Sequence, residues 1–207
     1  MSNSYKYLDP DYTYTDPISG LLRNLQDISY PDVLLFVESG AVTKRLQELY
    51  KNPLKIKGTD SVFEIHKHLF QDLYIWAGKK RIVEISKDGK QFFPTTNFEN
   101  AFRYIDSLIV DYKKISKDNK KQLAQKLSEI LDNVNYLNPF REGNGRTQRE
   151  FLRLLALEKG LILNLNPPNN KSVYERYMKG TIESDLVTLT ELIFELIDKN
   201  KNLTTKD

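Results

Sequence analysis

The residues with the greatest potential for chemistry lie together in one short segment of the chain. This segment, residues 138–149, has the sequence Asn138-Pro139-Phe140-Arg141-Glu142-Gly143-Asn144-Gly145-Arg146-Thr147-Gln148-Arg149. Gly143 and Gly145 flank Asn144 just before a predicted helix, so backbone N–H groups can converge on an anion without obstruction by Cβ atoms. The positive end of the helix dipole adds to this attraction. The segment therefore predicts a loop that holds a phosphate group.

Charged side chains beside this loop extend the prediction. Arg146 and Arg149 are three positions apart and share one helix face, so both guanidinium groups should point back over the loop and suit further phosphates. Glu142 supplies a carboxylate oxygen next to them, where a magnesium ion that bridges phosphates would be bound. Together these residues favour a site for the phosphates of a nucleoside triphosphate.

Each of these features alone also has an ordinary structural interpretation. A Gly-Asn-Gly sequence is usually a turn, and two arginines on a helix mostly lie on a solvated face. An isolated glutamate such as Glu142 is most often a surface carboxylate or an ion-pair partner, and Phe140 suits a core position in either case. It is the combination in one segment that indicates a phosphate site.

Helices are predicted on both sides of this segment. Apolar residues recur at helical spacing over residues 31–49, although Gly40 weakens that pattern, and again over 62–73, after the N-cap candidates Asp60 and Ser61. Thr96-x-x-Glu99 resembles a capping box that opens a further helix. The remaining helices are expected at 98–112, at 123–137 with Pro139 as its stop, at 146–160 with Gly160 at its end, and at about 172–179 and 184–199.

A β-hairpin is predicted within this helical chain. Residues 81–86 are rich in β-branched residues and meet residues 91–93 across Asp88-Gly89, a two-residue turn sequence, and Pro94 closes the unit. A lone hairpin has no sheet to join, so residues 81–94, here called the flap, should lie on the surface. Residues 1–30 are interpreted as an extended lead-in.

The sequence carries no repeat, low-complexity segment or Gly/Ser-rich linker. We therefore expect a single domain over residues 1–207, of the all-α class, organised as a helical bundle with one β-hairpin.

Composition excludes several classes of function. The 207 residues include no cysteine and only two histidines, so a disulfide framework, a thiolate metal site and a His-rich zinc site are ruled out. The net charge of +3, with both signs evenly mixed, does not suggest nucleic-acid binding. The longest aliphatic run, Val33–Val37, is too short to span a bilayer. No Sec signal precedes the domain, so a cytoplasmic location is expected, with delivery into a host cell by another route left open.

Residues 138–149 closely resemble the signature of the Fic family, His-Pro-Phe-x-(Asp/Glu)-Gly-Asn-Gly-Arg-x-x-Arg, at every specified position except the first. Ile65-His66, Leu69-Phe70 and Tyr74-x-Trp76-Ala77-Gly78 are similar to the stretch before the family's target-docking hairpin. The resemblance extends from about residue 60 to the last helix and implies the Fic-type fold.

This resemblance implies a protein adenylyltransferase, which transfers AMP from ATP, with Mg²⁺, to a Ser, Thr or Tyr hydroxyl of a target protein. By that analogy Glu142 holds the metal, and Gly143, Asn144 and Gly145 cradle the α- and β-phosphates. Arg146 grips the outer phosphates and Arg149 reaches the γ-phosphate. The flap is expected to clamp the target chain by strand pairing. Gly145 favours AMP transfer, because relatives that phosphorylate carry a bulkier residue there.

The first signature residue departs from the family pattern. The family has a histidine there that takes the proton from the target hydroxyl, whereas this chain has Asn138, whose amide cannot act as a general base near neutral pH. Loss of a general base typically costs about 10²–10⁴-fold in rate. Neither histidine is an obvious replacement, because His66 lies in an apolar helical stripe and should be a buried core residue, and His68 should face solvent.

Regulation and residual activity are left as alternatives. Many Fic proteins carry an inhibitory Ser/Thr-x-x-x-Glu-Gly/Asn helix, and this sequence offers only Lys179-x-x-x-Glu183-Ser184, with the wrong residues at both ends. Two alternatives follow. Either a separate antitoxin-like protein inhibits this chain, which would then be a toxin, or inhibition has been lost. The chain is interpreted as a transferase impaired at Asn138, with a nucleotide-binding pseudoenzyme and a protein-interaction module as the alternatives.

Overall fold

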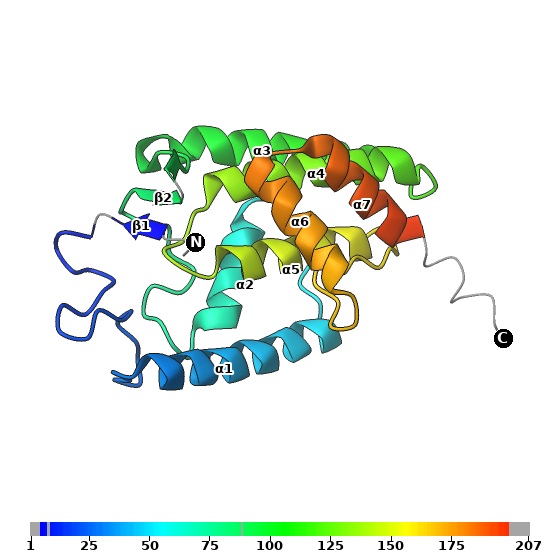
Figure 1. The fold of residues 1–207 in the computed structure, drawn as a ribbon. Helices are drawn as coiled ribbons and strands as arrows, with labels where there is room; N and C mark the ends of the chain where they lie inside the picture. The colour runs from blue at the N-terminus through cyan, green and yellow to red at the C-terminus, as the bar shows by residue number, and fades with distance from the viewer. Residues whose placement is uncertain (1–4, 8, 88, 199–207) are drawn as a thin grey trace.

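The computed structural model describes residues 5–7, 9–87 and 89–198 of the chain. The described helices are α1 (Pro31–Lys51), α2 (Asp60–Phe70), α3 (Phe98–Lys114), α4 (Lys120–Leu137), α5 (Asn144–Leu157), α6 (Lys171–Glu183) and α7 (Leu186–Asp198). They are joined by the strands β1 (Tyr5–Tyr7), β2 (Ile85–Lys87) and β3 (Lys90–Gln91) and by the 3₁₀ helix η1 (Thr95–Asn97). The predicted all-α class is confirmed (Figure 1).

Helix α4 is the centre of the bundle, because it packs against α3, α5, α6 and α7. Helix α2 packs against α5 on one side and α1 on the other, so α1 forms an outer layer opposite α3 and α4 (Figure 1). The link between α4 and α5 contains the phosphate-loop candidate. Both helices that flank this loop are therefore fixed by the core.

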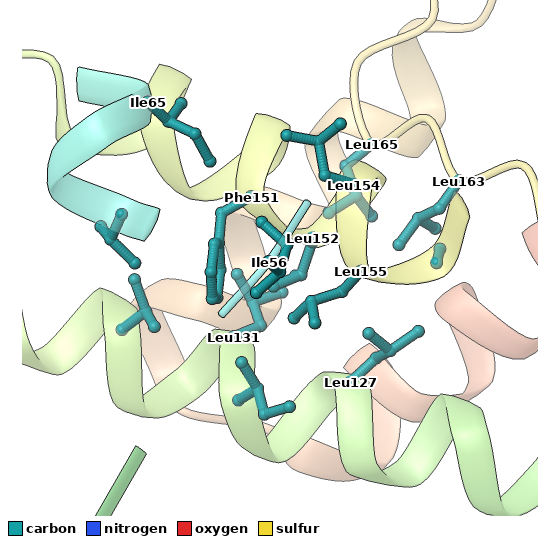
Figure 2. Close-up of a cluster of buried hydrophobic side chains, with 14 of the residues drawn as sticks. Ile56, Ile65, Leu127, Leu131, Phe151, Leu152, Leu154, Leu155, Leu163 and Leu165 are labelled. Carbon is teal, nitrogen blue, oxygen red and sulfur yellow. The ribbon is translucent and has the colours of Figure 1, made fainter. Parts of the chain in front are cut away.

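The apolar core explains why α5 is held in place. Figure 2 shows Phe151, Leu152 and Leu155 of α5 facing Leu127 and Leu131 of α4, and each of these side chains is at most 1% exposed. Burial of large aliphatic and aromatic side chains contributes about 1.5–3 kcal/mol each. Such a core anchors the N-terminus of α5 with little freedom to shift.

Several predicted helix limits differ from the structure. Helix α1 is unbroken through Gly40, an exposed position where an added Cβ would meet no atom within 4 Å. Helix α5 starts at Asn144, earlier than the predicted 146, because Gly143 already turns the chain with φ +81°. Helix α6 runs to Glu183, beyond the predicted 179, and its last turns reach the candidate site.

The predicted N-caps of α2 and α3 are wrong. The N-cap of α2 is Thr59, whose hydroxyl bonds to Asp106 on α3 and not to its own helix. The N-cap of α3 is Asn97, preceded by η1, and no side chain caps this helix. Glu99 pairs with Lys80 instead of closing a capping box. Tertiary partners have taken the polar groups that local sequence assigns to caps.

The interpretation of the hairpin as lacking a sheet is also wrong. Strand β1, from the extended lead-in, pairs antiparallel with β2, which gives a three-stranded sheet in the order β1-β2-β3. The hairpin itself is confirmed, but its strands are shorter than predicted because only Ser86↔Gln91 and Lys87↔Lys90 form pairs. Its predicted turn includes Asp88, which lies outside the described residues. β3 is left as the edge strand of the flap.

No helix in the described ranges is at once long enough and apolar enough to cross a membrane.

Candidate active site

The candidate loop starts with a change of backbone direction at Asn138. Helix α4 ends at Leu137, and Asn138 adopts the left-handed conformation (φ 42°, ψ 62°), which asparagine tolerates better than most residues. Pro139 cannot continue the helix. The chain then turns across residues 139–143 and enters α5, so the end of one buried helix and the start of another lie close together.

The side chain of Asn144 closes this loop. Its Oδ1 accepts a hydrogen bond from the Phe140 N–H at 2.9 Å, and its Nδ2 donates to the Phe140 carbonyl at 2.8 Å. Because both ends of the amide are engaged, the contribution of Asn144 to an anion site is through its backbone N–H group. The side chain instead keeps the loop in the shape that presents those N–H groups.

Gly143 is required by two independent constraints. Its φ of +81° lies in the left-handed region, which strains residues with a side chain. A Cβ added there would also lie 2.4 Å from Cζ of Phe70. Gly145 is less restricted, because its added Cβ would meet only Nη1 of Arg149, at 3.3 Å. The first turn of α5 thus presents backbone N–H groups from a tightly fixed start.

His66 of α2 supports the loop through a hydrogen bond and ring stacking, and the prediction that it is a buried core residue is confirmed. Its Nδ1 accepts the Gly78 N–H at 2.8 Å, so its Nε2 carries the proton and donates to the Glu142 carbonyl at 3.0 Å. The ring stacks on Phe140 with centroids 3.7 Å apart. Burial lowers the pKa of His66 to about 3. A neutral imidazole with both nitrogens engaged cannot replace the missing base.

Arg146 has a partner that the sequence did not predict. Its Nη1 lies 2.5 Å from Oε1 of Glu38 on α1, and its Nη2 lies 3.7 Å from Oε1 of Glu142. The guanidinium carbon lies 4.7 Å from the centroid of the Phe70 ring. Arg146 is therefore held between α1, α2 and the loop.

Arg149 contacts helix α6. Its guanidinium carbon is 5.5 Å from the Tyr174 ring centroid and 5.6 Å from that of Tyr177, both on α6. Both arginines line one cavity, with the partners of Arg146 on α1 and α2 and those of Arg149 on α6. Burial raises the pKa of Tyr177, whose hydroxyl accepts a hydrogen bond from Gln148. This arrangement gives the cavity an aromatic wall beside its cationic end.

The cavity has a volume of about 490 Å³ and lies between the loop, α6 and the flap. The predicted site residues that line it are Asn138, Glu142, Gly143, Gly145, Arg146 and Arg149. The flap contributes Lys87 and Lys90, and the Lys90 ammonium donates at 3.2 Å to the carbonyl of Ile182, which lines the cavity from α6. A cavity of this size suits a nucleotide.

Asn138 is 4% exposed and borders the cavity. Within the described part of the chain its Nδ2 has no hydrogen-bond partner, whereas its carbonyl accepts from Nε of Arg81 at 2.9 Å. Arg81, at the base of the flap, also donates to the carbonyls of Val83 and Phe93. One buried guanidinium therefore joins both arms of the flap to the backbone of residue 138.

The residues at the loop fit a magnesium ion that is coordinated mainly by the phosphates of a bound nucleotide. Over the described ranges there is no group of three or more His, Asp or Glu side chains that could form an all-protein cage. Glu142, 39% exposed, is the carboxylate at the loop, and its Oε1 accepts the Gly143 N–H at 2.9 Å. Mg²⁺ is commonly bound by one or two carboxylates together with substrate phosphates, so this donor set matches that mode.

Sequence reasoning missed several residues of the site. The missed cavity residues include Tyr174 and Tyr177 on α6 and Lys87 and Lys90 on the flap. The pair Tyr174 and Tyr177 has the i, i+3 spacing of one helix face, which could have marked an aromatic wall. No local signal marks Glu38, because its role depends on a contact more than a hundred positions away.

Comparison with known proteins agrees with this geometry. Residues 55–156 match the Fic/DOC family. The protein adenylyltransferase VbhT of Bartonella schoenbuchensis is 37% identical over 156 residues, which cover 75% of this chain and 33% of VbhT. The probable protein adenylyltransferase y4lH of Sinorhizobium fredii is 33% identical over 133 residues, which cover 64% of this chain and 67% of y4lH. The chain thus spans only a third of VbhT.

Solved structures share the fold at low identity. The N-terminal FIC domain of Bep8 from Bartonella sp. 1-1C has a TM-score of 0.80 at 20% identity, over 94% of this chain and 99% of that domain. BepC from Bartonella tribocorum, solved with bound AMPPNP, has a TM-score of 0.76 at 15% identity, over 89% and 96% of the two chains. The signature segment, the matched residues and the shared fold together show that this chain belongs to the Fic/DOC family.

Proposed function

We propose that this chain transfers AMP from ATP to a Ser, Thr or Tyr hydroxyl of a target protein, and that Asn138 impairs the transfer. The observation that carries the proposal is the cavity, where the N-terminus of α5, Glu142 and two arginines converge beside Asn138. The relative VbhT is named a protein adenylyltransferase, which supports the same reaction for this chain. The AMPPNP in BepC supports nucleotide binding by this fold.

Each residue has a role in the proposed reaction. Backbone N–H groups at Gly143, Asn144 and Gly145 would hold the α- and β-phosphates, and Arg146 and Arg149 would bind the outer phosphates. Glu142 would hold Mg²⁺, which supplies charge neutralisation on the phosphates when bound. The Tyr174 and Tyr177 rings would hold the Arg149 guanidinium in place beside the cavity.

Transfer requires a new bond between the target hydroxyl oxygen and the α-phosphorus. The bond from that phosphorus to the bridging oxygen of the β-phosphate breaks, and pyrophosphate leaves with the electron pair. The hydroxyl proton must go to a base, and the Asn138 amide cannot accept it near neutral pH. Phosphate binding and positioning do not depend on that side chain. The proposal therefore separates intact nucleotide binding from slow chemistry.

The target is proposed to dock on the flap by strand pairing. β1 already pairs with β2, so the outer edge of β3 is the edge of the flap on which a target strand could add. β3 consists of Lys90 and Gln91, and both residues also line the cavity. A docked strand would hold its hydroxyl near the α-phosphate. A separate antitoxin-like inhibitor is also proposed, since the chain lacks the family's inhibitory sequence.

A nucleotide-binding pseudoenzyme is the second candidate, because the cavity is complete while the base position is an amide. Calorimetry with ATP and magnesium tests the shared claim. We expect measurable binding by the parent chain and weaker binding by Arg146→Ala. No binding at millimolar concentrations would leave only the interaction-module alternative.

A second experiment tests which group is transferred. With the Asn138→His variant, label from α-labelled but not γ-labelled ATP should appear on protein if AMP is transferred. Label from γ-labelled ATP alone would indicate phosphoryl transfer instead.

A further inference from the structure

Glu38 is a buried carboxylate that neither the signature segment nor the matched residues 55–156 contain. It lies on α1 and is 8% exposed. Its Oε2 accepts a hydrogen bond from the Tyr74 hydroxyl, and its Oε1 pairs with Nη1 of Arg146 at 2.5 Å. Both oxygens are thus engaged, one by a phenol and one by the arginine assigned to the phosphates.

Tyr74 is itself fixed, so it can orient the carboxylate. Its ring is 2% exposed and stacks on Trp76 with centroids 4.4 Å apart. Burial, followed by the hydrogen bond to Glu38, raises the pKa of Tyr74, so its hydroxyl keeps its proton and remains a donor. The carboxylate is therefore held from one side before it meets Arg146.

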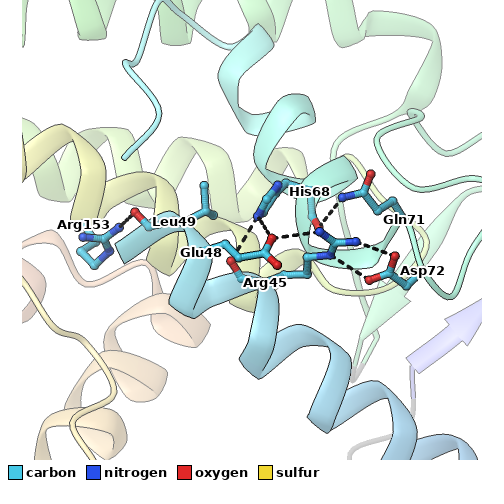
Figure 3. Close-up of polar contacts among 7 residues, drawn as sticks. All are labelled: Arg45, Glu48, Leu49, His68, Gln71, Asp72 and Arg153. Carbon is cyan, nitrogen blue, oxygen red and sulfur yellow. Dashed lines mark hydrogen bonds and ion pairs between the residues drawn. The ribbon is translucent and has the colours of Figure 1, made fainter. Parts of the chain in front are cut away.

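Helix α1 is also anchored, which fixes where Glu38 stands relative to α5. Figure 3 shows Arg45 of α1 bonded through Nε and Nη2 to the two carboxylate oxygens of Asp72, at 2.8 and 2.7 Å. Glu48 contacts Arg45 and His68, so His68 is paired and not simply solvent-facing as predicted. The polar contacts in Figure 3 tie α1 to the end of α2.

Glu38 lies behind Arg146 and not between this arginine and the nucleotide cavity. Arg146 lines the cavity and its side chain is 28% exposed, whereas neither Glu38 nor Tyr74 belongs to the cavity wall. Arg146 Nη2 remains 3.7 Å from Glu142 Oε1. The carboxylate therefore takes one edge of the guanidinium and leaves N–H groups on the cavity side.

We propose that Glu38, oriented by Tyr74, is a positioning residue that fixes Arg146 against Phe70 so that its free N–H groups face the outer phosphates of ATP. This inference rests on the proposed nucleotide site. A buried ion pair often adds little net stability, because removing both charges from water costs about as much as their attraction gains. We therefore assign this pair the role of holding Arg146 in one arrangement. By analogy with groups that orient metal ligands, whose removal typically costs about 10–100-fold in metal affinity or activity, we expect an effect at the lower end of that range for Glu38.

The test compares two ligands that differ in their phosphates. Dissociation constants for ATP with magnesium and for adenosine are measured on the intact chain, by calorimetry and ligand-observed NMR. Glu38→Gln should weaken ATP about 10-fold and leave adenosine within about 2-fold, because adenosine lacks the groups that Arg146 binds. Tyr74→Phe should shift ATP in the same direction by less. In an Arg146→Ala background, Glu38→Gln should have no further effect on ATP.

Glu150→Gln is the matched control, because Glu150 is 4% exposed and pairs with Arg153 at 2.6 Å but does not line the nucleotide cavity. It should leave both affinities unchanged. Equal weakening of ATP and adenosine, unchanged ATP affinity, or tighter ATP binding in Glu38→Gln would each overturn the positioning role. If Glu38→Gln does not fold, Tyr74→Phe with parental ATP affinity would overturn it. A parent chain that binds adenosine but not ATP would overturn the proposed function as well.

Discussion

The buried imidazole of His66 makes the stability of the domain depend on pH. His66 joins the Gly78 N–H to the Glu142 carbonyl and is 0% exposed. Protonation would place a charge among Phe70, Phe140 and Trp76 and would remove the acceptor that Gly78 uses. Burial, with a smaller opposing effect of the Glu142 hydrogen bond and a further lowering by Arg146, brings its pKa to about 3.

The sign follows from proton binding in the two states. The unfolded chain binds a proton at this residue near pH 6.5, and the folded chain does so only near pH 3. Unfolding therefore takes up a proton between these values, so acid favours the unfolded state. The contribution of His66 is fully present above pH 6.5 and is lost progressively as the pH falls towards 3.

The magnitude is large enough to measure. One pKa unit corresponds to about 1.4 kcal/mol, so about 1.5 units between the ordinary pKa and pH 5 give about 2 kcal/mol of lost stability at pH 5 relative to pH 7.5. Stability is measured by urea unfolding at both pH values for the parent and for His66→Gln. Glutamine can still donate to the Glu142 carbonyl but does not titrate in this range.

The comparison uses the difference between pH values, because loss of ring packing lowers the stability of His66→Gln at both. The parent should lose about 2 kcal/mol more than the variant on going from pH 7.5 to pH 5. Carboxylates with lowered pKa values, such as Asp72 and Glu84, contribute equally to both proteins and cancel. Equal losses in the two proteins would refute the account of His66 as a neutral buried support.

Three further predictions concern the loop and the flap. Gly143→Ala should lower stability by about 2–3 kcal/mol in urea unfolding, because a methyl group is strained there and meets Phe70; a change below about 0.5 kcal/mol would contradict this. Arg81→Met should lower stability by about 3 kcal/mol and speed proteolysis within the flap, since two buried hydrogen bonds and a partly buried one to backbone carbonyls are lost; unchanged proteolysis would contradict it. Replacing Asp88-Gly89 with two valines should impair target labelling and leave ATP affinity within about 3-fold. Equal loss of labelling and of ATP affinity would contradict the assignment of the flap to target docking.

The helices were predictable because they rest on repeated local pattern. The stripe from Leu123 to Leu137 and the stop at Pro139 place α4 correctly, since both depend on neighbours three or four positions apart. The tight turn between α4 and α5 was predictable for the same reason, because Pro139 and Gly143 lie close together in the sequence. That this loop binds phosphate stays a prediction.

Contacts between distant segments could not be predicted. The pairing of β1 with β2 joins residues about eighty positions apart, and nothing in Tyr5–Tyr7 alone specifies that partner. Asp60 and Ser61 were predicted as N-caps, whereas the N-cap is Thr59, whose hydroxyl donates to Asp106 on another helix. Glu38 reaches Arg146 only because α1 packs along α2. Tertiary contacts overrode local preference at each of these positions.

The central claim is that a complete nucleotide site lacks only its general base, and Asn138→His tests it most directly. Residue 138 has φ 42°, a conformation that histidine also tolerates, and it borders the cavity next to the flap. The rate at which α-labelled ATP modifies protein, with magnesium, is measured for both chains at matched ATP occupancy. The account predicts a rise of about 10²-fold or more in Asn138→His. If the substituted chain binds ATP as well as the parent and neither labels any protein, the account is contradicted and the chain is a nucleotide-binding pseudoenzyme.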